Sequence, residues 1–217
     1  MEGVPKLYGW RWPVAAALCV AFVSLLAGRA MRLDPLAFSG AYGLAVALLA
    51  AAFVIVPGIE PGRQLARRWR AGAAGGTLLG LWTARGALAE IGLVDLHWRS
   101  VAGVTAYGIW YGAAEALAVS VVPVLSLYGA LPAEVLIDPG RRLRHGGIAL
   151  AASAVIALAN SVAFAYDGAG NLVTSVAGNL VFTLGYLLTG SPLTPLLGHA
   201  IAHSIWALSG PMLPPPF

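Results

Sequence analysis

The stretch "NLVFTLGYLLTGSPLTPLLGHAIAHSIW" (residues 179–206) is apolar on both sides of a short Thr-Gly-Ser-Pro step and contains no charged residue. An α-helix needs roughly 20 apolar residues to cross a bilayer, and the stretch belongs to two apolar runs of nearly that length. It therefore predicts two membrane helices joined by a tight turn. The second helix carries His199 and His203, and residues four apart lie on one helix face, so both imidazoles can point at one spot.

The composition of the whole chain agrees with a membrane location. Of its 217 residues, 59% are hydrophobic and 10% are charged, which is too much apolar surface for a soluble domain of this length. The apolar runs are continuous rather than alternating, which favours helices over barrel strands. We expect an all-α, polytopic transmembrane bundle forming one integral membrane domain over residues 1–217. Its seven candidate spans are 13–31, 36–57, 72–93, 101–129, 147–166, 172–188 and 193–209.

The distribution of basic residues predicts the orientation of the chain. Nine of the thirteen lysines and arginines fall in the N-terminal segment, the 58–71 loop and the 130–146 loop, which seven spans place on one side. Short cytoplasmic loops carry the excess of basic residues, so we expect the N-terminus in the cytoplasm and the C-terminus outside. The plasma membrane of a prokaryote is the expected location. The lone Cys19 rules out a disulfide framework and a thiolate metal site.

The basic segment "EPGRQLARRWRAG" (residues 60–72) admits two interpretations. Its arginines fall at helical intervals with Trp69 among them, as in an interfacial stripe that binds anionic lipid or an acidic partner. The commoner interpretation of such a segment is an ordinary cytoplasmic anchor. Nucleic acid is not an expected partner, because the basic residues lie at helix ends of a membrane protein and not on a soluble face.

Ionisable side chains at membrane depth are candidate functional residues, because they are costly there unless paired or hydrated. Glu115 is expected roughly 20 Å from the outer end of its helix, and His199 and His203 about 9 and 15 Å above the inner end of theirs, so the three can share a layer. They would make a zinc ligand set with one position open for water. They also suit metal-free chemistry, with glutamate as base and histidine as hydrogen-bond donor. A buried polar cluster that only holds helices together is the third interpretation. Other polar groups near membrane depth are Arg85, Glu90, Asn160, Asp167 and Asn179.

The segment "GYLLTGSPLTPLLGHAIAH" (185–203) resembles the C-terminal signature of the CPBP family, the CAAX prenyl endopeptidase and bacteriocin-processing (ABI) intramembrane proteases. That signature ends in His-x-x-x-Asn, and here His203 takes the place of the asparagine. "YGAAEALAVSVVP" (111–123) lies where the family has Glu-Glu-x-x-x-Arg, but it supplies Glu115 alone, with Ala116 and Ser120 at the other two positions. "NSVAFAYDGAG" (160–170) matches Phe-x-x-x-His only at Phe164, since Gly168 stands at the histidine position.

The resemblance implies a CPBP-like core over 101–209, preceded by variable N-terminal helices over 1–100. It implies that Glu115 is the general base, that His199 and His203 orient water or bind a metal such as Zn²⁺, and that Asp167 is a candidate for the missing second-motif role. Arg85 is a candidate counter-charge for Glu115, and a snorkelling or water-exposed arginine is the alternative. The expected activity is metal-dependent cleavage of a membrane-embedded or lipidated peptide. The alternative is a non-catalytic scaffold or accessory subunit, bound to a membrane protein partner or to an isoprenoid-like ligand.

Overall fold

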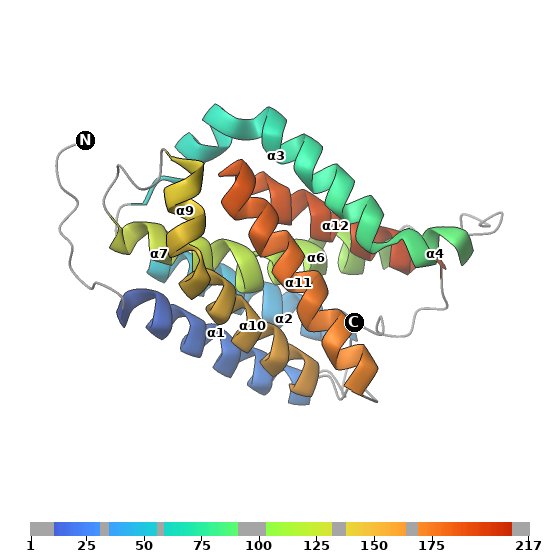
Figure 1. Cartoon of the computed structure of the whole chain (residues 1–217). Coiled ribbons are helices and arrows are strands. Elements are labelled where there is room, and N and C mark those ends of the chain that lie inside the picture. Colours follow the sequence, from blue (N-terminus) through green and yellow to red (C-terminus); the bar gives the residue numbers. More distant parts are fainter. Residues whose placement is uncertain are drawn as a thin grey trace.

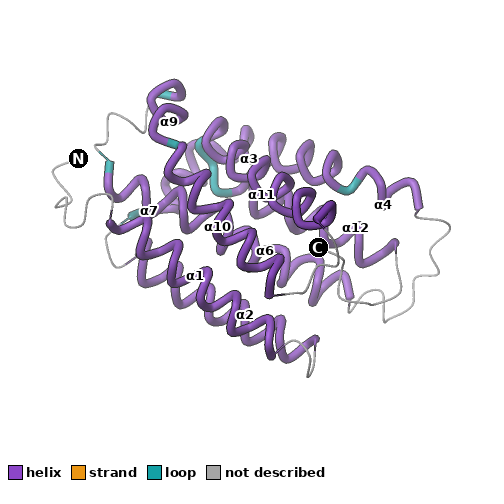
Figure 2. Tube along the Cα trace, turned by 60° about the horizontal axis from the view of Figure 1, so that its bottom comes forward, coloured by secondary structure: helices purple, strands orange, loops and turns teal. Residues whose placement is uncertain are grey.

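The computed structural model describes residues 11–30, 35–55, 59–90, 103–131, 138–163 and 169–209, and every regular element in these ranges is helical (Figures 1 and 2). Three of the elements, η1 to η3, are π-helical, with wider turns than an α-helix. In chain order the elements are α1 (Arg11–Ala30), α2 (Pro35–Ala50), η1 (Ala51–Ile55), α3 (Pro61–Thr83), α4 (Arg85–Glu90), η2 (Val104–Tyr111), α6 (Gly112–Ala116), η3 (Leu117–Val121), α7 (Val122–Ala130), α9 (Pro139–His145), α10 (Gly147–Ala163), α11 (Ala169–Thr189) and α12 (Leu193–Ser209).

Two helices in the described part of the chain are long and apolar enough to cross a membrane, Val104–Ala130 and Leu172–Thr189. A third is added if the bent pair Pro139–His145 and Gly147–Val162 forms one span. Arg11–Leu26 and Ser39–Ile55 are apolar but shorter. The all-helical prediction is confirmed for the described residues, whereas the seven-span bundle stays a prediction.

The structure corrects the predicted helix boundaries in two places. The stretch 58–71, expected to be a loop, is helical from Pro61 onward, because proline suits the first turn of a helix and the following Gln, Leu, Ala and Arg residues are good helix formers. The 130–146 loop contains the short helix α9, whose N-cap residue Asp138 accepts a hydrogen bond from the backbone N–H of Arg141 at 3.0 Å. Basic residues at these two places therefore lie on helices.

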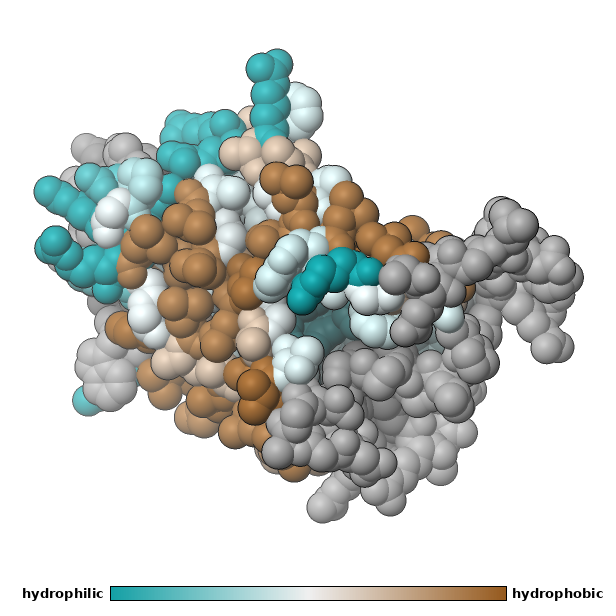
Figure 3. Space-filling model, turned by 45° about the vertical axis from the view of Figure 1, so that its right-hand side comes forward, coloured by the Kyte–Doolittle hydropathy of each residue, from teal (hydrophilic) through white to brown (hydrophobic). Residues whose placement is uncertain are grey.

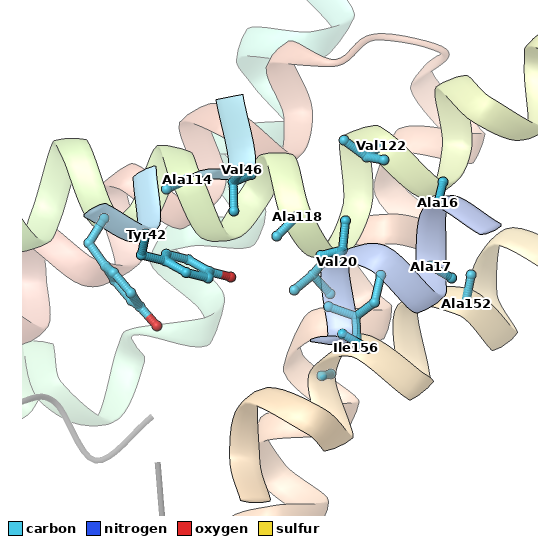
Figure 4. Packing of buried hydrophobic residues seen from close by; sticks show 14 residues of the cluster. Ala16, Ala17, Val20, Tyr42, Val46, Ala114, Ala118, Val122, Ala152 and Ile156 are labelled. Atoms are coloured by element: carbon cyan, nitrogen blue, oxygen red, sulfur yellow. The ribbon is translucent and has the colours of Figure 1, made fainter. Parts of the chain in front are cut away.

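One part of the core forms where α1 lies between α10 and the η3–α7 segment (Figure 4). Val20 of α1 packs against Ile156 of α10, and small alanines along the contact let the helices approach closely. On the far side of the cluster, Tyr42 and Val46 of α2 lie against Ala114 of α6. This packing supports the face of α6 that is next to Glu115.

Helix α12 packs most extensively on α3 and on η2, and next on α6, and glycines make the contacts with α3 and α6 close. A Cβ atom added at Gly80 of α3 would lie 2.8 Å from the backbone oxygen of Gly198. A Cβ atom added at Gly112 of α6 would lie 3.0 Å from the backbone oxygen of His199. The helix with the two histidines is thus held in direct backbone contact with the segment that carries Glu115.

Three hydroxyl groups join η3, α10 and α11. Thr183 Oγ1 lies 2.8 Å from both Ser120 Oγ and Ser153 Oγ, and it lies 3.2 Å from the backbone oxygen of Asn179. A threonine hydroxyl has one donor and two acceptor positions, so Thr183 donates to the backbone oxygen and accepts from the two serines. Ser120 is fully buried, and its hydroxyl forms this interhelical bond.

Candidate functional site

Glu115 lies near the middle of the long helical segment Val104–Ala130, in the five-residue α6. The π-helical segments η2 and η3 flank α6 on both sides, and such wide turns occur frequently at functional sites. The residue is only 4% exposed, although a carboxylate is strongly disfavoured in an apolar interior unless it has partners. Its partners come from α12.

Both histidines approach the same carboxylate oxygen. His203 Nε2 lies 2.7 Å from Glu115 Oε2, a short hydrogen bond, and His199 Nδ1 lies 3.8 Å from the same atom. The side chains of Glu115 and His199 are 5% and 4% exposed, and that of His203 is 11% exposed. The imidazole rings stack on one face of α12, with centroids 5.9 Å apart and planes 15° apart. The three predicted residues therefore form one buried cluster.

Aromatic and amide side chains fix the orientation of this cluster. Phe182 of α11 lies 4.2 Å from the ring centroid of His199, and the Tyr111 ring meets His203 edge-on at 5.4 Å. Asn179 of α11 is a polar neighbour of the Glu115 carboxylate and is itself 6% exposed. Its Nδ2 donates to the backbone oxygen of Ser175 at 3.1 Å, which holds the amide in place. Four segments of the fold, α6, η2, α11 and α12, thus contribute side chains.

The nitrogen and oxygen atoms of this cluster match the ligands of a divalent metal ion in chemical type and in spacing. One nitrogen or oxygen from each of Glu115, His199 and His203 can be chosen so that all three lie within 4.8 Å of one another. Ligand atoms around a tetrahedral zinc ion, each about 2.0–2.1 Å from it, lie about 3.3 Å apart. The observed separations of 2.7 and 3.8 Å from Glu115 Oε2 lie on either side of that value. His199 Nε2 is buried and has no hydrogen-bond partner among the described residues, so it is also available to a ligand.

Of the remaining predicted site residues, Arg85 has a described side chain, and it does not join the cluster. Asp167, Phe164 and Gly168 lie outside the described residues, as does the side chain of Glu90. Arg85 is exposed, and its guanidinium lies over the Trp82 ring at 4.8 Å and donates to the Trp82 backbone oxygen. The expectation that Arg85 supplies the counter-charge of Glu115 is therefore wrong, because its guanidinium contacts Trp82 near the end of α3 and its side chain is exposed.

Two contributors to the site were not identified from the sequence. Tyr111 precedes Glu115 by four residues and so shares its helix face. This spacing could have identified Tyr111 from the sequence. Phe182 had no such signal, since an aromatic residue in an apolar helix is ordinary core. Asn179 stood out only as an uncharged polar residue at membrane depth, and its position beside Glu115 depends on how α11 is rotated.

Comparison of the chain with protein-family models, with curated proteins and with solved structures gave no match. The geometry of the Glu115, His199 and His203 cluster is therefore the basis for a functional assignment.

Proposed function

We propose that the protein is an integral membrane peptidase of CPBP type, metal-dependent, that hydrolyses a membrane-embedded or lipidated peptide. The observation that carries the proposal is the convergence of Glu115, His199 and His203, with donor atoms within 4.8 Å of one another in the apolar interior. The proposal includes seven spans in a prokaryotic plasma membrane, with a cytoplasmic N-terminus and an outer C-terminus, in accord with the positive-inside distribution.

The roles of the three side chains follow from their contacts. Two histidines and a carboxylate would hold zinc with one position open, and zinc bound there would supply Lewis-acid activation of water. Both imidazoles approach Oε2 of Glu115, so Oε1 is the oxygen left to accept a proton from water. Without zinc, the His203 hydrogen bond to Oε2 would hold the carboxylate in one orientation, whereas with zinc bound His203 Nε2 would be a ligand instead. The amide of Asn179, which is next to the carboxylate and also donates to the Ser175 backbone oxygen, helps to hold Glu115 in place.

One observation favours the second candidate, a non-catalytic scaffold or accessory subunit that binds a membrane protein or an isoprenoid-like ligand. Glu115 and His203 bond each other directly at 2.7 Å, which satisfies both groups without any ligand. Ala116 and Ser120, buried at the positions of the motif's second glutamate and arginine, contribute no charge to the site. The first candidate is preferred because a purely structural bond does not require a second histidine 3.8 Å from the same oxygen.

A cleavage assay in liposomes tests the proposal. Farnesylated and transmembrane peptides carrying a fluorophore and a quencher are the substrates, with and without the chelator 1,10-phenanthroline. We expect cleavage that the chelator and Glu115→Gln both abolish and that Ser126→Ala retains. Ser126 is a matched control, because it is buried in the same long helical segment and its hydroxyl donates to the backbone oxygen of Pro123. Cleavage that persists unchanged in Glu115→Gln would contradict the assignment.

A further inference from the structure

The end of the molecule formed by the start of α3 and by α9 carries most of the described positive charge. These two segments hold seven arginines, whereas the described acidic residues beside them are Glu60 and Asp138. Glu60 forms an ion pair with Arg63, and Asp138 caps α9 through the backbone N–H of Arg141. The carboxylates at this end are thus engaged at the helix starts and leave most of the arginine charge uncompensated.

Each segment is fixed to the α11–α12 turn by one arginine. Arg142 of α9 is 2% exposed, and its Nη2 donates to the backbone oxygen of Leu188 at 3.2 Å. Arg68 of α3 donates from Nη1 to the backbone oxygen of Thr189, also at 3.2 Å. The next residue, Gly190, has φ +67°, and a Cβ atom there would collide with the Arg142 guanidinium and crowd the Arg68 side chain. The two arginines therefore meet around the C-terminal end of α11, where cations are favoured.

Both segments are also bent relative to the helices that follow them. The backbone at Arg68 departs from helical values, with φ −129° and ψ 21°, which kinks α3. Helix α9 makes an angle of 51° with α10. An ordinary positive-inside anchor requires only that cations be present on one side, whereas here two bent basic helices are fixed on the same turn (Figures 1 and 2).

The outward side of these helices combines free cations with apolar side chains. The exposed arginines of α3 and α9 that form no ion pair with a described residue are Arg67, Arg70, Arg141 and Arg144. Trp69 is 53% exposed with the Arg70 guanidinium over its ring, and Leu65 and Leu143 are exposed as well. Figure 3 shows hydrophilic side chains gathered at this end next to a broad hydrophobic flank.

We propose that this surface, formed by Arg67, Arg70, Arg141 and Arg144 with Trp69, binds the phosphate headgroups of anionic phospholipids. Clustered arginines attract anionic headgroups, and tryptophan and leucine beside them suit the boundary between headgroups and acyl chains. An acidic protein would match the charge but would not account for the adjoining hydrophobic flank. A lipid bound there contacts both α3 and α9. It therefore stabilises the hydrogen bonds that their arginines donate to the end of α11, just before the turn into α12. This inference does not depend on the proposed peptidase activity.

Native mass spectrometry of the full chain in detergent, titrated with phosphatidylglycerol or phosphatidylcholine, tests this inference. We expect the wild type to bind phosphatidylglycerol more tightly, and each surface arginine replaced by glutamine to weaken that binding about fivefold. Arg67→Gln/Arg70→Gln/Arg141→Gln/Arg144→Gln is expected to lose the preference entirely. Arg85→Gln is the matched control, since Arg85 is also exposed and lies over a tryptophan, but away from α9.

Two results would overturn the inference. One is a wild type with equal affinity for the two lipids, and the other is a quadruple variant that keeps the preference. A polyglutamate peptide that binds the wild type through the same four arginines, with phosphatidylglycerol failing to compete, would assign the surface to an acidic protein instead. Thermal melting of the quadruple variant in phosphatidylcholine nanodiscs checks its fold, and an unfolded variant is replaced by the pairs Arg67→Gln/Arg70→Gln and Arg141→Gln/Arg144→Gln.

Discussion

Substitution of Gly80 by alanine tests the contact between α3 and α12 on which the site depends. A Cβ atom there would lie 2.8 Å from the backbone oxygen of Gly198 and 2.9 Å from Ile201 Cβ. Ordinary contacts begin at about 3.4 Å, so one of the two helices must move by roughly half an ångström. Overpacking of this kind costs about 1–3 kcal/mol. The same substitution gains about 1 kcal/mol because alanine favours the helix more than glycine does.

Gly178→Ala isolates the packing cost, because Gly178 is also in a helix interior and a Cβ atom there would meet nothing within 4 Å. The helix-propensity gain is common to both variants and cancels in the comparison. With a packing cost of about 2 kcal/mol and about 2–4 °C per kcal/mol, Gly80→Ala should melt about 4–8 °C below Gly178→Ala. Thermal melting of both variants in one detergent, followed by circular dichroism, measures the difference. Equal melting temperatures would refute the close contact of α3 with α12.

Three further substitutions have expected outcomes. Glu115→Ala leaves two buried imidazoles without their carboxylate and should lower the free energy of unfolding by about 1.5–3 kcal/mol, measured by denaturant titration, whereas Glu115→Gln should lose less. Thr183→Val removes two interhelical hydrogen bonds, those to Ser120 and Ser153. At about 0.6 kcal/mol for each bond, the free energy of unfolding in the same titration should fall by about 1 kcal/mol. Hydrogen bonds from the backbone N–H groups of Arg141 and Gly140 hold the pKa of the Asp138 carboxyl below its usual range. The stability that this cap adds is present above about pH 4 and is lost as the pH falls through the lowered pKa, so the melting temperatures of wild type and Asp138→Asn should differ less at pH 3 than at pH 6.

The helical character of the chain could be predicted because it depends on the length and continuity of apolar runs. Each of the seven predicted segments overlaps helical structure in the described residues. The span count could not be fixed in the same way, since among the described residues two or three helices meet the length and hydropathy of a span. The sequence did not place the helix start at Pro61, because the segment was treated as the basic connection between two apolar runs, although its arginines fall at helical intervals and arginine is a good helix former.

The meeting of Glu115 with His199 and His203 was expected from two simple quantities, the i, i+4 spacing and the rise per residue. The 2.7 Å bond to His203 and the 3.8 Å distance to His199 were beyond sequence reasoning, because they depend on the rotation of α12. That rotation is fixed by backbone contacts at Gly80, Gly108 and Gly112. The high glycine and alanine content of the chain hides such contacts, since most glycines in it look alike until the helices are placed.

The central claim, that Glu115, His199 and His203 form a metal centre, is tested most directly by the metal content of the purified protein. Inductively coupled plasma mass spectrometry would compare the wild type with His199→Ala and His203→Ala, all purified without chelators. We expect near-stoichiometric zinc in the wild type and its loss in both variants. A metal-free wild type, together with variants that unfold at the same temperature as the wild type, would contradict the claim.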